Sequence, residues 1–127
     1  MADTSLEATI NAAWEERTSL SATTQGAVRK AVEDALAALD SGAMRVAQKD
    51  ASGAWSVNQW LKKAVLLSFR LNPNRSMGAP GQQPGPYWDK VPTKFEVWSD
   101  AQFSAAGFRA VPGAVVRRGS FIAKDAV

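Results

Sequence analysis

The fold of this 127-residue chain is decided by the stretch NQWLKKAVLLSFRL, residues 58–71. Its apolar side chains cover most of the circumference of a helix, interrupted by Lys62, Lys63 and Arg70. Asn58 is suited to the N-cap position, where its side chain accepts a hydrogen bond from a free backbone N–H. A helix that is apolar on most sides must be covered by other elements, so we expect it at the centre of the core.

Two amphipathic helices are predicted before this stretch. The first begins near Thr4, where Thr4-Ser5-Leu6-Glu7 has the spacing of a capping box, and continues to about Arg17. The second covers residues 28–39 and ends at Asp40-Ser41-Gly42, because glycine readily adopts the left-handed conformation that closes helices. The apolar residues that recur at helical spacing are Leu6, Ile10, Ala13, Trp14, Val28, Val32, Ala35, Leu36 and Leu39.

A hairpin and a loop flank the central helix. Residues 44–48 and 54–57 are predicted as antiparallel strands, joined by the turn-rich segment 49–53. Residues 72–86 hold four prolines and three glycines, which predicts an exposed loop. A short fourth helix is expected to start at Ser99, where a second capping box occurs, and to stop at Gly107.

The last twelve residues show a six-residue period. The hexads VRRGSF (116–121) and IAKDAV (122–127) each open on an aliphatic residue and carry a small residue in fifth place. Hexads of this form stack short parallel strands into a β-helix. A single buried strand gives a similar local pattern, and two hexads do not distinguish the two interpretations.

Composition excludes several kinds of chemistry. The chain has no Cys and no His, so it offers no disulfide, no thiolate nucleophile, no Ser-His-Asp triad and no thiolate zinc site. A metal would need oxygen ligands alone, and no site for one is predicted. No stretch reaches the roughly 18–20 apolar residues of a membrane span, and the acidic start at Asp3 and Glu7 is unlike a signal peptide. The length is sufficient for one domain with a single contiguous core. We expect the protein to be cytoplasmic.

Charge is unevenly distributed along the chain. Residues 1–44 carry seven acids and three bases, whereas residues 45–127 carry five acids and twelve bases. The basic second part favours anionic partners, and Arg117-Arg118 beside Phe121 or Lys62-Lys63 beside Trp60 would suit nucleic acid. No nucleic-acid motif accompanies these pairs, so a solvated charged face is the competing interpretation.

No catalytic centre can be assembled from the motifs alone. The carboxylate pairs Glu15-Glu16 and Glu33-Asp34 each place adjacent side chains about 100° apart on a helix, so we interpret all four as surface residues. The glycines near Gly81 lack the Lys-Ser/Thr ending of a phosphate loop.

Arg109 has the best physical case for a binding role. It follows Gly107-Phe108 and precedes Val111-Pro112, at the joint between the helical part and the repeat. A guanidinium at a rigid joint can hold a carboxylate through two parallel hydrogen bonds. An interdomain salt bridge is the alternative.

Several long strings, in order along the chain, strongly resemble the tetrahydrodipicolinate N-succinyltransferase family. The longest is the ungapped string of residues 58–70, which is highly specific. The strings are DSGAMRVA (40–47), NQWLKKAVLLSFR (58–70), DKVPTKF (89–95), GFRAVP (107–112) and VRRGSFIA (116–123).

The resemblance implies a cytoplasmic, homotrimeric bacterial enzyme of lysine and diaminopimelate biosynthesis. Such enzymes transfer succinyl from succinyl-CoA, a co-substrate rather than a bound cofactor, to the amine of opened tetrahydrodipicolinate. The Gly-Phe-Arg motif carries a substrate-binding arginine, which falls on Arg109. The resemblance therefore implies a dicarboxylate and a coenzyme A thioester as partners, and neither nucleic acid nor membrane.

The fold implied is α+β. Residues 1–110 would form a small helical substrate-binding domain with a β-hairpin, and residues 111–127 the first hexapeptide strands of a left-handed parallel β-helix. The proline- and glycine-rich loop 72–86 departs from the family pattern, and no role is carried over to it. The family's acidic catalytic residues and coenzyme A groove belong to the β-helix and have no counterparts here, so no catalytic residue is assigned within the chain. A stand-alone interaction module and a nucleic-acid binder stay open, as does acetyl in place of succinyl.

Residues 1–127 by themselves are therefore expected to be inactive. Supplied with succinyl-CoA and 2-aminopimelate, the chain should release no coenzyme A thiol above the blank. Turnover well above the blank would contradict this expectation and place a catalytic base within these residues.

Overall fold

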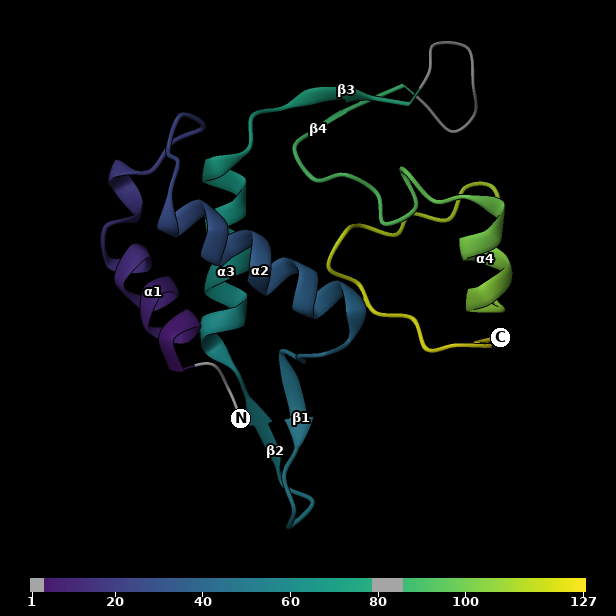
Figure 1. The fold of residues 1–127 in the computed structure, drawn as a ribbon, viewed down its shortest axis with the longest axis horizontal. Coiled ribbons are helices and arrows are strands. Elements are labelled where there is room, and N and C mark those ends of the chain that lie inside the picture. Colours follow the sequence, from purple (N-terminus) through teal and green to yellow (C-terminus); the bar gives the residue numbers. More distant parts are fainter. Residues whose placement is uncertain (1–3, 79–85) are drawn as a thin grey trace.

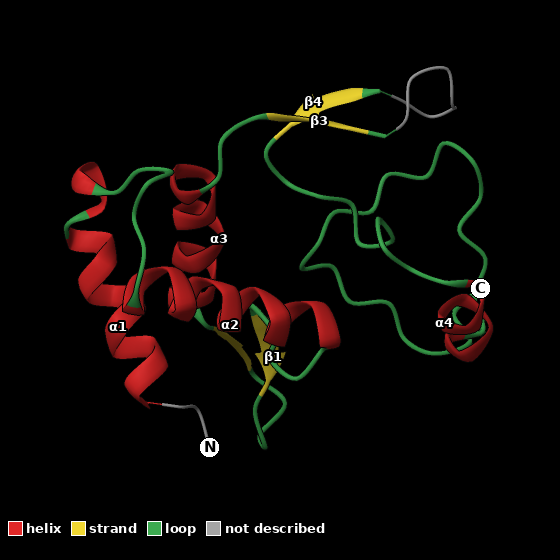
Figure 2. Cartoon of the chain, turned by 45° about the horizontal axis from the view of Figure 1, so that its top comes forward, coloured by secondary structure: helices red, strands yellow, loops and turns green. Residues whose placement is uncertain are grey.

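The computed structural model describes residues 4–78 and 86–127. Three helices gather into one body, while the fourth helix lies apart from them beside the irregular carboxyl-terminal segment (Figures 1 and 2). The elements are α1 (Thr4–Glu15), a short 3-10 helix (Arg17–Ser19), α2 (Ala27–Ser41), β1 (Ala47–Lys49), β2 (Trp55–Val57), α3 (Gln59–Leu71), β3 (Arg75–Met77), β4 (Tyr87–Asp89) and α4 (Asp100–Ala106). The prediction of a small helical domain with a hairpin is confirmed.

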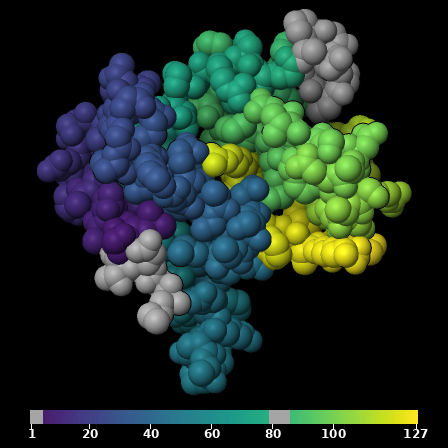
Figure 3. Space-filling model, viewed as in Figure 1, coloured from purple at the N-terminus to yellow at the C-terminus, as the bar shows by residue number. Residues whose placement is uncertain are grey.

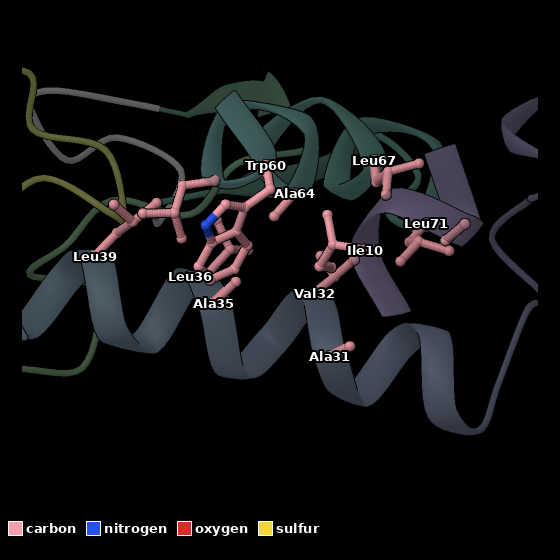
Figure 4. Packing of buried hydrophobic residues seen from close by; sticks show 12 residues of the cluster. Ile10, Ala31, Val32, Ala35, Leu36, Leu39, Trp60, Ala64, Leu67 and Leu71 are labelled. Carbon is pink, nitrogen blue, oxygen red and sulfur yellow. The ribbon is translucent and has the colours of Figure 1, made fainter. Parts of the chain in front are cut away.

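Helix α3 is the centre of the core, as its apolar circumference predicts. It packs against both α1 and α2, which also pack against each other. Leu61, Ala64 and Leu67 on α3 are fully buried, and they meet the fully buried Ile10 of α1 and Val32 of α2. Figure 4 shows Ile10, Val32, Ala64 and Leu67 converging between the helices. Burial of apolar surface among three mutually packed helices supplies the main stabilisation of this body.

Helix ends follow the sequence signals, with two exceptions. Gly42 closes α2 in the left-handed conformation at a φ of 79°, as predicted. Helix α1 ends at Glu15, two residues before the expected end, because the chain tightens into the 3-10 turn. The capping box expected at Thr4 involves a side chain outside the described part of the structure.

The Asn58 cap is correct in position and wrong in chemistry. Asn58 stands before α3, but its side chain accepts no bond from the first turn of the helix. Instead its Nδ2 donates to the Arg45 carbonyl at 2.7 Å, and its backbone N–H donates to the Val46 carbonyl at 2.7 Å. Asn58 therefore ties the base of the β1–β2 hairpin to the start of α3.

The described residues form two antiparallel strand pairs, of which one was predicted. In the first, Ala47 pairs with Val57 and Lys49 with Trp55, around a turn at Asp50. In the second, Arg75 pairs with Asp89 and Met77 with Tyr87. The prediction of a loop over residues 72–86 is therefore wrong for β3, while residues 79–85 of that loop lie outside the described residues.

Helix α4 has the predicted ends. The Ser99 Oγ accepts from the Gln102 N–H, and the Gln102 side chain accepts from the Ser99 N–H at 2.8 Å, which completes the capping box. Gly107 ends the helix in the left-handed conformation at a φ of 73°.

The carboxyl-terminal segment turns every six residues. Backbone bonds close turns from Ala114 N–H to Val111, from Ser120 N–H to Arg117 and from Ala126 N–H to Ala123, at 3.0, 3.2 and 3.3 Å. The third residue of each turn has a positive φ: 90° at Gly113, 97° at Gly119 and 60° at Asp125. The three turns thus recur at intervals of six residues, and the first of them, at residues 111–114, precedes the two hexads noted in the sequence.

Polar contacts fasten this segment to the helical body. The Asp40 carboxylate at the end of α2 accepts from the Gly119 N–H at 2.8 Å and pairs with the Lys94 ammonium at 2.9 Å. Lys94 Nζ also donates to the Asp40 carbonyl at 2.8 Å. The Arg118 guanidinium pairs with Glu33 of α2 at 2.6 Å. These contacts place the segment along α2, from its middle at Glu33 to its end at Asp40.

We expect Lys94→Met to loosen this junction. The Lys94 side chain is 6% exposed, so its loss leaves the Asp40 oxygens without a charged donor, at a cost of about 2 kcal/mol of unfolding free energy. Urea denaturation measures that loss, and trypsin cleavage after Arg117 and Arg118 should accelerate.

The exposed Lys62 supplies the control, because Lys62→Met should change stability by less than about 0.5 kcal/mol. Equal effects of the two substitutions would show that the Lys94 contacts do not hold the segment.

Candidate functional site

Arg109 leaves α4 at a sharply defined point. The left-handed Gly107 ends the helix, and Phe108 and Arg109 follow it into the extended chain. Arg109 is exposed and borders an open hollow on the protein surface. The other residues that line this hollow are Phe103, Phe108, Ala110, Val111 and Pro112. Arg109 is therefore the one charged residue among those that line the hollow, and the other five are apolar.

Two rings that line the hollow, Phe103 and Phe108, belong to a larger aromatic cluster with Phe95 and Trp98. Phe95 lies 4.9 Å from Trp98, 5.2 Å from Phe103 and 5.9 Å from Phe108, between ring centroids. The rings meet at tilted or edge-on angles, the arrangement that aromatic quadrupoles favour. Because these rings join the 95–98 loop to α4 and to Phe108, they fix the chain immediately before Arg109.

A second contact fixes the end of α4 from the carboxyl-terminal segment. The Asp125 N–H donates to the carbonyl of Ala106, the last residue of the helix, at 2.9 Å. The Asp125 carboxylate lies against Gly107 so closely that a Cβ added there would overlap it. Gly107 therefore meets two requirements, a positive φ and the lack of a side chain, and both bear on the backbone that presents Arg109.

Arg109 makes no ion pair or hydrogen bond with any residue in the ranges 4–78 and 86–127. The interdomain salt bridge considered as its alternative role has no partner there. Within those ranges, Arg70 is the other arginine in this condition, since the rest bind carboxylates or carbonyls or stack on rings. Arg109 is thus an exposed cation whose donors are available to a ligand.

The basic pairs singled out as a nucleic-acid surface do not form one patch. Arg117 pairs with Asp89 at 2.6 Å, and Arg118 reaches Glu33 on a different element. The Lys90 backbone N–H and the Arg117 guanidinium hold the pKa of Asp89 below its ordinary value. Lys63 donates to the Asn11 side chain at 2.7 Å. Each of these three cations therefore has a different partner within the fold.

The adjacent carboxylates Glu33 and Asp34 likewise bind different partners. Glu33 binds Arg118, whereas its neighbour Asp34 binds Lys30 on the same helix at 2.6 Å. Glu33 is on the surface as predicted, although sequence reading missed its partner, which is 85 residues away along the chain.

The described residues contain neither a cluster of metal ligands nor a membrane-spanning helix. Among residues 4–78 and 86–127, no group of three or more acidic side chains is placed to hold a metal ion. No helix in that part of the chain is long and apolar enough to cross a membrane.

Comparison with known proteins identifies the family. Residues 5–71 match the family model described as the tetrahydrodipicolinate N-succinyltransferase N-terminal domain. The chain belongs to this family. The matched region contains the whole three-helix body, and the resemblance found in the sequence is confirmed.

Curated relatives extend the match to nearly every residue. Over 126 residues the chain is 64% identical to the 2,3,4,5-tetrahydropyridine-2,6-dicarboxylate N-succinyltransferase of Rhodopseudomonas palustris strain TIE-1, covering 98% of this chain and 44% of that protein. The protein of that name from Caulobacter vibrioides is 60% identical over 129 residues, covering 100% of this chain and 46% of its own length. The chain spans less than half the length of these relatives.

We predict that Gly107→Ala disturbs the Arg109 segment. The new methyl group must displace Asp125 and occupies a backbone conformation that costs about 1 kcal/mol without a side-chain clash. The substitution should lower the unfolding temperature and speed hydrogen exchange at Phe108 and Arg109.

Gly113→Ala is the matched control, since Gly113 also has a positive φ but nothing lies within 4 Å of an added Cβ. Asp125→Gly in the Gly107→Ala background should recover part of the loss. If the two alanine variants behave alike, the Asp125 contact has no role in fixing the end of α4.

Proposed function

We propose that residues 1–127 are the amino-terminal, substrate-binding part of an N-succinyltransferase. The whole protein would transfer succinyl from succinyl-CoA to the amine of opened tetrahydrodipicolinate, in lysine and diaminopimelate biosynthesis. The observation that carries this proposal is the 64% identity over 126 residues with a protein named for the reaction. Succinyl-CoA is a substrate in this scheme, and no tightly bound cofactor is required.

Arg109 is proposed as the clamp for one carboxylate of the substrate. The parallel N–H groups of a guanidinium match the two oxygens of a carboxylate, so they fix both its position and its plane. Two observations support this role: Arg109 has no partner among the described residues, and its hollow is otherwise apolar. The apolar lining residues can contact the hydrocarbon chain of a dicarboxylate.

Succinyl transfer requires a catalytic base and a site for the thioester, and we assign both to the rest of the protein. The substrate amine attacks the thioester carbonyl, a base takes the amine proton, and the thiolate of coenzyme A leaves from a tetrahedral intermediate. The 127 residues contain no histidine, and the described acidic side chains do not gather in the Arg109 hollow. We therefore propose no catalytic residue within the chain.

We propose that residues 111–127 begin a left-handed parallel β-helix, while residues 1–110 form the substrate-binding domain. Turns that recur at Gly113, Gly119 and Asp125 support this division, because a β-helix of hexads places its corners at six-residue intervals. In the proposed cytoplasmic homotrimer, a neighbouring subunit would complete the site around Arg109. Arg117 and Arg118 pair with carboxylates on different elements, so they do not form the shared basic patch that would support a nucleic-acid partner.

Arg109→Ala is expected to weaken binding of 2-aminopimelate to the chain by roughly tenfold or more, because charge-assisted hydrogen bonds contribute roughly 1.5–3 kcal/mol each. Amide chemical shifts of Phe108 and Ala110 during a titration measure this affinity locally. In the full reading frame, the same substitution should raise KM for the amine substrate and leave KM for succinyl-CoA unchanged.

Arg70→Ala is the control, since Arg70 is likewise exposed and without a partner among the described residues. Its affinity should equal that of the unaltered chain. Unchanged binding in Arg109→Ala, or no binding by the unaltered chain, would contradict the assignment of the clamp to Arg109.

A further inference from the structure

A second cavity, separate from the Arg109 hollow, lies between the helical body and the carboxyl-terminal segment. Its volume is about 230 Å³, below the roughly 300–1,000 Å³ of sites for drug-sized ligands, so it suits a smaller molecule. It shares no lining residue with the Arg109 hollow. In Figure 3, yellow atoms of the carboxyl-terminal segment are visible in this seam, between blue α2 and the green residues that follow β4.

One side of the cavity is apolar. Leu36 of α2 meets Val65 and Phe69 of α3 there, and Val91 and Pro92 continue this surface on the facing loop. Ser68, which also lines the cavity, is buried, and its hydroxyl donates to the Val65 carbonyl at 2.6 Å. This surface offers a bound molecule contact with hydrocarbon and has little capacity to solvate a charge.

Three cations also line the cavity, and they are incompletely paired. These are Lys90, Arg117 and Arg118. Within the described residues, Lys90 donates to the Phe69 carbonyl at 3.1 Å, Arg117 to Asp89 and Arg118 to Glu33, one hydrogen bond each. An ammonium has three N–H donors and a guanidinium has five, so most donors of these three side chains have no protein partner.

The charges of these groups and their ion-pair partners sum to one positive unit. Arg117 pairs with Asp89 and Arg118 with Glu33, whereas Lys90 has no carboxylate partner among the described residues. A ligand with a single negative charge balances this excess. A second negative charge would exceed it, and the desolvation of that charge would not be compensated.

We propose that this cavity binds an amphipathic monocarboxylate, of which a short fatty acid is the simplest example. Its carboxylate accepts hydrogen bonds from Arg117 and Arg118, and its hydrocarbon chain lies against Leu36 and Val65. This site is independent of the proposed function, since Arg109 takes no part in it.

Hexanoate is the probe, and the amide signals of Gly119 and Ser120, which line the cavity, report its binding to the chain. Acetate has the same charge without the chain, and 1-hexanol has the chain without the charge. We expect hexanoate to shift the Gly119 and Ser120 signals, and each of the other two to bind roughly tenfold more weakly or worse, because each lacks one of the two interactions.

Two substitutions on either side of one ion pair separate ligand binding from a structural role. Arg118→Gln removes donors and charge, so hexanoate should bind roughly tenfold more weakly. Glu33→Gln releases the Arg118 guanidinium from its carboxylate, so hexanoate should bind several-fold more tightly. If the Arg118–Glu33 ion pair only holds the carboxyl-terminal segment against α2, both substitutions should loosen that contact. The hexanoate affinity would then fall in both variants.

Arg109→Ala is the control for site identity and should leave hexanoate affinity unchanged. Lys90→Met provides a second weakening variant if Arg118→Gln does not fold. The proposal is overturned if Gly119 and Ser120 do not shift, if acetate or 1-hexanol binds as tightly as hexanoate, or if Glu33→Gln weakens binding. None of these results bears on the binding of 2-aminopimelate at Arg109.

Discussion

The Asp40 carboxylate, at the end of α2, is the contact on which the position of everything after β4 depends. It pairs with the Lys94 ammonium and accepts the Gly119 N–H, so one side chain holds two segments that are 25 residues apart along the chain. Every residue described as buried lies between Ile10 and Met77. Because the later part of the described chain has no buried core of its own, polar contacts and half-buried rings must place it against the helical body.

That dependence explains how a small element such as α4 can present a binding residue accurately. Seven residues make two turns, which are marginal as a free helix. The capping box at Ser99 closes its start, the aromatic cluster of Phe95, Trp98, Phe103 and Phe108 covers its side, and Asp125 closes its end. Arg109 therefore extends from a backbone fixed by the capping box of α4 itself, by the rings of the loop before it and by Asp125.

The sequence predicts the elements whose signals are local and misses those that depend on distant partners. Helical periodicity and left-handed glycines identify the three-helix body and the ends of α4. The predicted cap at Asn58 does not form because its side chain binds the Arg45 carbonyl instead. Strand β3 was not predicted because the strand partner of Arg75, Asp89, lies 14 residues later in the chain. Arg109 is identifiable as a candidate from its place after Gly107, but its freedom from ion pairs requires the structure.

The uneven charge of the chain has an internal explanation. Two ion pairs join acids of the first 44 residues to bases of the remainder: Asp40 with Lys94, and Glu33 with Arg118. The asymmetry that suggests an external polyanion is thus partly electrostatic complementarity between the helical body and the segment docked on it. Arg109 makes no such pair among the described residues, so all its donors are available to a carboxylate, whereas Arg117 and Arg118 each keep only the donors that their ion pairs leave unused.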